Sequence, residues 1–489
     1  MPKVLVVGFD GATWDIINPL VDQNNMPTFR KLMNESTWGH LESTIPPITI
    51  PAWISMFSGL APEKLRMFDF VRLKVNGNVE STLFNSHDFK GKVIWDFLSQ
   101  ENTESLVLNM PGTYPPYPVR GHIIGFDLTP MENCTYPGEI EKLLIRDYNF
   151  CEIKELQKTI HRGEKTALRV TEEEEKKILE ILTSFSRTYS YDTIFVRFGI
   201  PDHVSHHSIR DEAMVRCHVL MDFILKTVID SIEFDYLILV SDHGIRKEDK
   251  VFYINRYLED VNLLKTSTEN RILRFFVSSF SEIFGEEQTK SLYKKMMGFL
   301  KKRLDVEKRS SFVLEKLDMG KTVVFGYLGA PTNFCPLYIT DMDFKDRIIE
   351  ELETSKYIRN IHLLACENPF AIVESQYPIS PLIVSKKEVA LESHWVHDMK
   401  GIFLVYGKDV KKGYNLDCNI CDVAPTLLFM LGLPVPDTMD GNIVTEIFEE
   451  DSEIGKRTPE YVDIEYYTKR NEEEKLKRSI RRFKMLEKT

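Results

Sequence analysis

Acidic residues that could bind a metal ion follow three apolar stretches of this chain. KVLVVGFDGA leads into Asp10, YDTIFVRFGIPDH leads into Asp202, and FDYLILVSDHG leads into Asp242 and His243. Each stretch has the apolar, β-branched composition of a buried parallel strand. Because ligands of open α/β sheets bind beyond the carboxyl ends of the strands, we expect these side chains at one site.

Histidines accompany these carboxylates. His206 follows Asp202 by four residues, a spacing that places both side chains on one face of a helical turn. Near the C-terminus, ESHWVHDMKG adds His394 and His397 as candidates. Mixed carboxylate and imidazole ligands suit zinc, or manganese, better than calcium or magnesium, which prefer oxygen ligands. Singly, each aspartate is typical of a helix cap and each histidine of a core residue, so the hypothesis depends on their convergence.

Thr49 lies in TIPPITIPAWISMFSG, directly before an expected helix. The ordinary role of such a threonine is to cap the helix. Its hydroxyl could instead act as a nucleophile if a metal ion or a base removed its proton. The residue by itself does not decide between these roles.

The composition limits the classes of protein to consider. Of 489 residues, 43% are hydrophobic, which excludes a disordered chain, and the net charge of -12 gives no general attraction to nucleic acid or to anionic membranes. Seven cysteines, an odd number, argue against a disulfide framework. The N-terminus lacks signal-peptide character, and no apolar run reaches the roughly 18 residues of a membrane span. We therefore expect a cytoplasmic protein.

The order of the elements predicts an α/β fold, with a doubly wound, mostly parallel sheet flanked by helices. After Gly244 the composition changes to a long stretch rich in Lys, Phe and Met, which indicates an inserted cap. The cap contains the basic segment KSLYKKMMGFLKKRL, expected to be an amphipathic helix. The last third of the insertion could instead belong to the core. The expected units are core residues 1–244, the insertion 245–390, core residues 391–445 and a charged helical tail 446–489.

One expected helix has a specific start signal. In TEEEEKKILEILTSFSR, Thr171 and Glu174 have the spacing of a capping box. We expect the helix to begin there, and its run of glutamates to form a solvated face.

Five motifs together carry a family resemblance. VVGFDG, TIPPITIPAWISMFSG, PDHVSH, VSDHG and HDMKGIFLVYG, in this order, resemble the alkaline phosphatase superfamily, and within it the type I phosphodiesterase/nucleotide pyrophosphatase family with its archaeal and bacterial members. The resemblance covers roughly residues 3 to 445. It implies an alkaline-phosphatase-like core.

The resemblance also implies roles for individual residues. Thr49, in Thr49-Ile50-Pro51, matches the family's nucleophile, which forms a covalent threonyl intermediate. The family pattern has three residues between its ligand histidine and a glycine, which favours His397 over His394 because Gly401 has that spacing. Two divalent ions are implied, most simply zinc. One set of implied ligands is Asp10, Thr49, Asp242 and His243, and the other is Asp202, His206 and His397.

Two departures from the family pattern bear on the substrate. Ala52 replaces an asparagine that contacts the phosphoryl group in many relatives, and Leu65-Arg66 replaces a His-Gly pair, which makes Arg66 a candidate substrate-binding residue. The implied activity is hydrolysis of phosphodiesters or nucleotide pyrophosphates. A phosphomonoesterase, phosphonate hydrolase or mutase of the superfamily is the alternative, and an inactive metal-binding scaffold is the alternative of another class. The expected partner is a small phosphate ester and not a nucleic acid polymer, and the sequence leaves the oligomeric state open.

Overall fold

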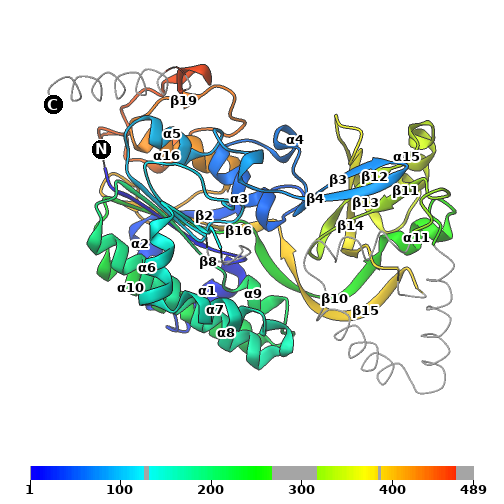
Figure 1. Ribbon diagram of the computed structural model, residues 1–489, viewed down its shortest axis with the longest axis horizontal. Coiled ribbons are helices and arrows are strands. Elements are labelled where there is room, and N and C mark those ends of the chain that lie inside the picture. Colours follow the sequence, from blue (N-terminus) through cyan, green and yellow to red (C-terminus); the bar gives the residue numbers. More distant parts are fainter. Residues whose placement is uncertain (1, 126–131, 267–316, 384–386, 468, 470–489) are drawn as a thin grey trace.

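The computed structural model describes residues 2–125, 132–266, 317–383, 387–467 and 469. These residues form two lobes, a larger one built on a broad sheet and a smaller one built on a second sheet (Figure 1). The basic segment KSLYKKMMGFLKKRL and the end of the charged tail, both expected to be helical, lie outside the described residues. Within the described residues no helix has the length and apolar character to cross a bilayer. The cytoplasmic location stays a prediction.

The larger sheet has five central strands that run parallel, in the order β9-β1-β8-β5-β6 with a sixth and antiparallel neighbour, β16, beside β9. This arrangement confirms the expected mostly parallel sheet. Its described strands are β1 (Val4–Phe9), β2 (Thr37–Glu42), β5 (Ser105–Leu108), β6 (Gly121–Ile124), β7 (Thr135–Tyr136), β8 (Thr193–Phe198), β9 (Tyr236–Val240), β16 (Lys400–Gly407), β17 (Tyr414–Asn415) and β18 (Cys418–Asn419).

Both faces of this sheet are covered, and for that reason its central strands are apolar on both sides. In β1, Leu5 and Val7 belong to one hydrophobic cluster, whereas Val4 and Val6 belong to the other. The first cluster is covered by α1 (Trp14–Asp22), α2 (Pro27–Glu35), α6 (Glu139–Tyr148), α7 (Phe150–Gln157), α8 (Glu164–Thr188), α9 (Asp202–Ser205) and α10 (Asp211–Ser231). The second is covered by α3 (Thr49–Ser58), α4 (Pro62–Leu65), α5 (Ile94–Gln100) and α16 (Val423–Met430).

The smaller lobe contains a six-stranded sheet in the order β11-β12-β14-β10-β15, with β13 paired to β14. Its elements are β10 (Gly244–Tyr253), α11 (Ile254–Asp260), β11 (Val324–Gly326), β12 (Thr332–Ile339), α15 (Lys345–Glu353), β13 (Ile358–Leu363), β14 (Ala371–Ser380) and β15 (Val389–Asp398). A hairpin of β3 (Val71–Asn76) and β4 (Asn78–Leu83) extends from the larger lobe to the smaller one. Its residues Val71 and Leu73 join the core of the smaller lobe. Short elements complete the described fold: β19 (Val435–Pro436), β20 (Tyr461–Val462), η1 (Ser86–Asp88), η2 (Ile160–Arg162), η3 (Met342–Phe344), η4 (Ile420–Asp422) and η5 (Thr445–Ile447).

A two-stranded ribbon joins the lobes. β10 starts at Gly244, directly after His243, and pairs antiparallel with β15, which ends at Asp398 just before β16 returns to the larger sheet (Figure 1). β13 and β14 lie in the last third of the expected insertion, whose membership of the core the sequence left open, and both hydrogen-bond within the smaller sheet. The chain therefore leaves and re-enters the larger lobe at adjacent points.

Helix α8 differs from the expectation in two ways. It begins at Glu164 after Gly163, seven residues before Thr171, which is buried inside the helix and does not cap it. The glutamate run is also not wholly solvated, because Glu174 and Glu175 are buried. Four consecutive positions cover the full circumference of a helix, so part of the run must face inward once α8 packs on the sheet.

Burial and the neighbouring Glu174 raise the pKa of Glu175 from 4.5 to about 8. Between these values the folded chain keeps a proton that the unfolded chain has lost, so the free energy of unfolding falls as the pH rises through this window. The slope contributed by one such group is about 1 kcal/mol per pH unit.

We predict that Glu175→Gln flattens this dependence, because glutamine does not titrate. Urea denaturation between about pH 5 and pH 8 measures the slope. Glu173→Gln, on the exposed side of the same helix, is the matched control and should leave the slope unchanged. Parallel stability curves for wild type and Glu175→Gln would contradict the assignment.

Candidate metal centre

Three adjacent parallel strands bring the predicted acidic residues to one edge of the larger sheet. β1 lies between β8 and β9, and all three run in the same direction. Asp10 directly follows β1, Asp242 and His243 follow β9, and Asp202 begins α9 shortly after β8. The convergence expected from the sequence is therefore a consequence of this strand order.

Asp10, Asp242 and His243 form one group whose ligand atoms all lie within 4.8 Å of one another. The Nε2 atom of His243 is 3.5 Å from Oδ1 of Asp10 and 3.4 Å from Oδ2 of Asp242. All three side chains are completely buried. Such a group of potential ligands in a protein interior needs a cation or bound protons to offset its negative charge.

Each member of this group uses its other polar atom to fix its orientation. Nδ1 of His243 donates to the Gly244 carbonyl at 3.0 Å, which leaves Nε2 as an acceptor, and Oδ1 of Asp242 accepts from the Gly11 amide at 3.3 Å. Oδ2 of Asp10 accepts from Arg197 at 2.6 and 2.8 Å. It also accepts from Nε1 of Trp53 at 3.2 Å.

The atoms that face the centre of the group are different. Oδ1 of Asp10, Oδ2 of Asp242 and Nε2 of His243 are buried and have no hydrogen-bond donor among the described residues. Three converging acceptors without a donor are unfavourable unless a cation lies between them. The donor set of two carboxylates and one imidazole fits a transition metal such as zinc.

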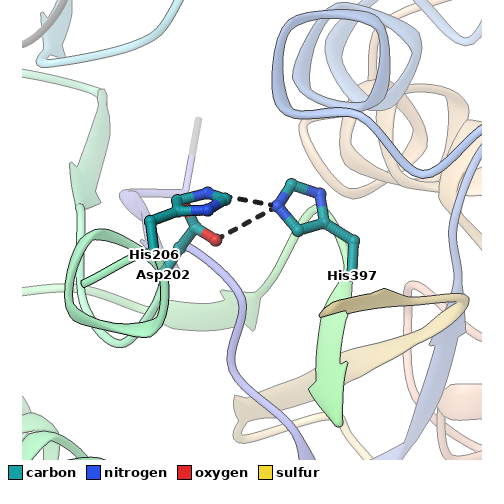
Figure 2. Close-up of side chains that lie close together, drawn as sticks. All are labelled: Asp202, His206 and His397. Atoms are coloured by element: carbon teal, nitrogen blue, oxygen red, sulfur yellow. Dashed lines mark hydrogen bonds and ion pairs between the residues drawn. The ribbon is translucent and has the colours of Figure 1, made fainter. Parts of the chain in front are cut away.

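Asp202, His206 and His397 form the second group (Figure 2). Nε2 of His206 is 3.3 Å from Oδ2 of Asp202, and Nε2 of His397 is 3.3 Å from Oδ1 of the same carboxylate. The two imidazole Nε2 atoms are 3.4 Å apart. The side chain of His206 is 34% exposed, so this group is open to solvent on one side.

His397 reaches this group from the ribbon of the smaller lobe. It lies within β15, opposite Ile245 of β10. Its Nδ1 atom donates to the Pro47 carbonyl at 2.9 Å, so Nε2 points toward Asp202. His394, three residues earlier on β15, lies outside both groups, and its Nδ1 contacts the Glu392 carbonyl.

The two groups adjoin each other. The rings of His243 and His397 stack with centroids 3.7 Å apart and planes inclined by 18°. Because His243 belongs to the first group and His397 to the second, the two candidate metal positions are neighbours on either side of these stacked rings.

Thr49 begins α3, where it is buried, and its surroundings are tied to the ligand-bearing segments. Pro47, two residues earlier, accepts the hydrogen bond from His397, and Trp53, one helical turn later, donates to Asp10. Ser43 donates to the Asp242 carbonyl at 2.5 Å. These contacts hold the start of α3 beside both groups.

In the second group the carboxylate and the imidazoles stabilise each other's charged forms. Burial alone raises the pKa of Asp202, but His206 and His397 outweigh it and hold this pKa well below its ordinary value. Burial likewise opposes the protonation of His206, yet the adjacent Asp202 raises the pKa of that imidazole. A carboxylate between two imidazoles is therefore ionised when the protein is folded.

In the first group the pKa shifts have the opposite signs: that of the carboxyl is raised and that of the imidazole is lowered. Burial and the charges of Asp10 and Asp202 raise the pKa of Asp242 well above its ordinary value. Burial and the nearby His397 lower the pKa of His243 to about 4, so its imidazole is neutral at pH 7. A neutral imidazole is the form that binds metals, whereas Asp242 must lose its proton first.

Arg66 and Arg197 lie in different surroundings. Arg66 directly follows α4, has an exposed side chain and belongs to neither group, so its role in substrate binding stays a prediction. Arg197, which we did not predict, contacts Asp10 directly from β8 and is almost completely buried. The signal was present in FVRFG, because a lone arginine within an apolar strand requires a buried partner.

Comparison with known proteins places the chain in a family. The model of the type I phosphodiesterase/nucleotide pyrophosphatase family matches residues 4–319, so the chain belongs to this family of hydrolases, as the motifs indicated. No match was found among curated proteins.

Solved structures share the fold at low sequence identity. Murine ectonucleotide pyrophosphatase/phosphodiesterase 5 matches with a TM-score of 0.53 and 14% identity over 91% of this chain and 100% of that one. The inactive threonine-to-alanine variant of the murine protein, in complex with AMP, matches with a TM-score of 0.54 and 14% identity over 92% of this chain and 100% of that one. The human protein matches with a TM-score of 0.53 and 14% identity over 91% of this chain and 98% of that one.

We predict that His397→Ala lowers the metal content from two ions per chain to one, and lowers activity more than about 100-fold, because a ligand of the second group is lost. His394→Ala, the matched control on the same strand, should keep both ions and most of the activity. Elemental analysis of protein purified without chelator measures the content. The reverse pattern would show that His394 is the ligand.

Metal binding should also strengthen as the pH rises through the raised pKa values of Asp242 and His206. An ion must displace the protons that these side chains retain in the metal-free protein, and each displaced proton makes affinity rise about tenfold per pH unit. Calorimetry of zinc binding in buffers of different ionisation enthalpy counts the released protons. We expect at least one near pH 6, and binding without proton release would contradict the raised pKa of Asp242.

Proposed function

We propose that this hydrolase cleaves phosphodiesters or nucleotide pyrophosphates, with Thr49 as the nucleophile and two divalent ions as cofactors. The observation that carries the proposal is the placement of Thr49 at the start of α3, in a segment hydrogen-bonded to both candidate ligand groups. Zinc is the preferred ion and manganese the alternative, because both groups combine carboxylate with imidazole.

The ions are assigned to the two groups. Asp10, Asp242, His243 and the Thr49 hydroxyl would hold one, and Asp202, His206 and His397 would hold the other. When bound, they would supply Lewis-acid chemistry, which lowers the pKa of a hydroxyl and neutralises charge on a phosphoryl group.

The start of α3 contributes to substrate binding. The first amides of a helix have no acceptor within it, and together with the helix dipole they favour a phosphoryl group. In α3 these are the amides of Thr49 and Ile50, because Pro51 has no N–H and Ala52 donates to Ile48.

The chemistry assigned to Thr49 takes two displacements. Its Oγ1 attacks phosphorus and loses its proton, while the bond to the leaving oxygen breaks and that oxygen takes up a proton. The resulting threonyl phosphate ester is then hydrolysed by water, which restores the hydroxyl. In support, a threonine-to-alanine variant of the murine relative is described as inactive and was obtained in complex with AMP.

A preference for diesters over monoesters is part of the proposal. A monoester dianion needs more positive charge than a diester, and two of the cations that could supply it are already paired. Arg197 contacts Asp10, and Lys64 forms an ion pair with Asp440. If a monoester is cleaved more than about tenfold faster in kcat/KM than every diester of a chromogenic panel, the monoesterase alternative is correct.

Thr49→Ala should lower kcat by at least about a thousandfold on the best ester, because the nucleophile is lost, whereas Thr49→Ser should restore part of the rate. Ser55→Ala, which removes another buried hydroxyl of α3, is the matched control and should stay near wild type. Assays with added zinc or manganese, metal content and thermal unfolding are measured for each variant.

Near-normal turnover by Thr49→Ala would rule out the covalent mechanism while leaving the metal assignment standing. Bound metal with no turnover of any ester by the wild-type chain would instead favour the inactive scaffold.

A further inference from the structure

The outer side of α10 exposes apolar side chains. Its inner side packs on the sheet, yet Val215 and Val219 are each 39% exposed and Phe223 is 60% exposed. These residues are four apart and so lie on one stripe of the helix. α10 forms part of the helical layer on one face of the larger sheet (Figure 1). A contiguous exposed apolar stripe on a helix indicates an interaction surface.

Charged residues end this stripe in a symmetric way. Glu212 lies seven residues before Val219 and Lys226 lies seven residues after it, while Val215 and Phe223 lie four before and four after. The side chains of Glu212 and Lys226 are 79% and 63% exposed, and each forms an ion pair within its own chain, Glu212 with Arg210 at 3.4 Å and Lys226 with Asp230. Ion pairs this exposed contribute little, so both charges stay accessible to a partner. The stripe is therefore symmetric about Val219: an apolar residue lies on each side of it and a charged residue at each end. The two end charges have opposite signs.

We propose that this stripe binds a second copy of the chain in an antiparallel, two-fold symmetric dimer. A two-fold axis passing at Val219 brings that residue against itself, and Val215 of one copy against Phe223 of the other. The same operation places Glu212 opposite Lys226 of the second copy, twice per interface. The apolar contacts supply affinity, and the two charge pairs fix the antiparallel direction.

Other occupants fit the stripe less well. An anionic membrane would attract a basic helix, but the exposed side of α10 carries Glu212 and Asp230 as well as Lys226, and Arg216 is neutralised by Glu172 of α8 at 2.6 Å. The net charge of the chain is -12. A second copy offers an opposite charge at both ends of the stripe.

The expected affinity is modest. Fourteen steps of 1.5 Å separate Glu212 from Lys226, a contact about 21 Å long, so the interface is at the small end of specific protein–protein contacts. We therefore expect a dimer with a dissociation constant on the order of micromolar.

Sedimentation velocity of the full chain, from about 1 to 200 μM, tests the dimer, because this range brackets micromolar affinity. Wild type should pass from monomer to dimer, and Phe223→Glu should raise the dissociation constant more than tenfold. Leu391→Glu is the matched control, because Leu391 is 75% exposed but lies on β15, and it should dimerise like wild type. A wild-type monomer over the whole range, or a dimer insensitive to Phe223→Glu, overturns the proposal.

Charge reversal tests the arrangement itself. Glu212→Lys and Lys226→Glu should each weaken the dimer, because each places like charges opposite one another, whereas the double variant should recover the wild-type dissociation constant. A Val219→Cys variant should form a symmetric disulfide on oxidation, and Leu391→Cys should not. Failure of the double variant to recover, with both single variants weakened, overturns the antiparallel pairing. A monomer that binds anionic vesicles through Phe223 would assign the stripe to membranes and overturn the dimer.

Discussion

The site depends on three carboxylates that the sheet brings together away from water. Asp10, Asp202 and Asp242 follow adjacent parallel strands and are buried at one edge. Arg197 offsets the charge of Asp10, and the imidazoles of the second group offset that of Asp202. Burial, and then the remaining negative charge, raise the pKa of Asp242 well above its ordinary value. The surrounding hydrogen bonds therefore hold an arrangement that a bound cation would stabilise.

The smaller lobe completes the site. His397 belongs to the ribbon that joins the lobes, and its backbone amide donates to the Pro331 carbonyl of the smaller lobe at 3.0 Å. Its imidazole is held by Pro47 of the larger lobe. One residue is thus positioned by both lobes, so a shift of the smaller lobe would move a candidate ligand. Because β10 starts directly after His243 and its partner β15 carries His397, the ribbon between the lobes is connected to both groups.

The sequence predicted the elements that carry the chemistry better than their surroundings. Apolar runs ending in aspartate identified β1, β8 and β9, because buried parallel strands are apolar on both faces. Local signals failed in α8, where Thr171 and Glu174 have the spacing of a capping box but the helix starts at Glu164. A capping signal acts over one turn, whereas the start of α8 is set by packing along the whole helix.

By itself, the sequence determined the residue types, the spacing of Asp202 and His206 within one helical turn, and the family to which the motifs point. The motif spacing favoured His397 over His394, but only the tertiary structure decided how His397 reaches the second group, and that Arg197 contacts Asp10. The physical reason is the range of the interactions. Spacing within one turn or one strand is local, but the register of β15 on β10 and the order of strands in the sheet are set by hydrogen bonds between segments far apart in the chain.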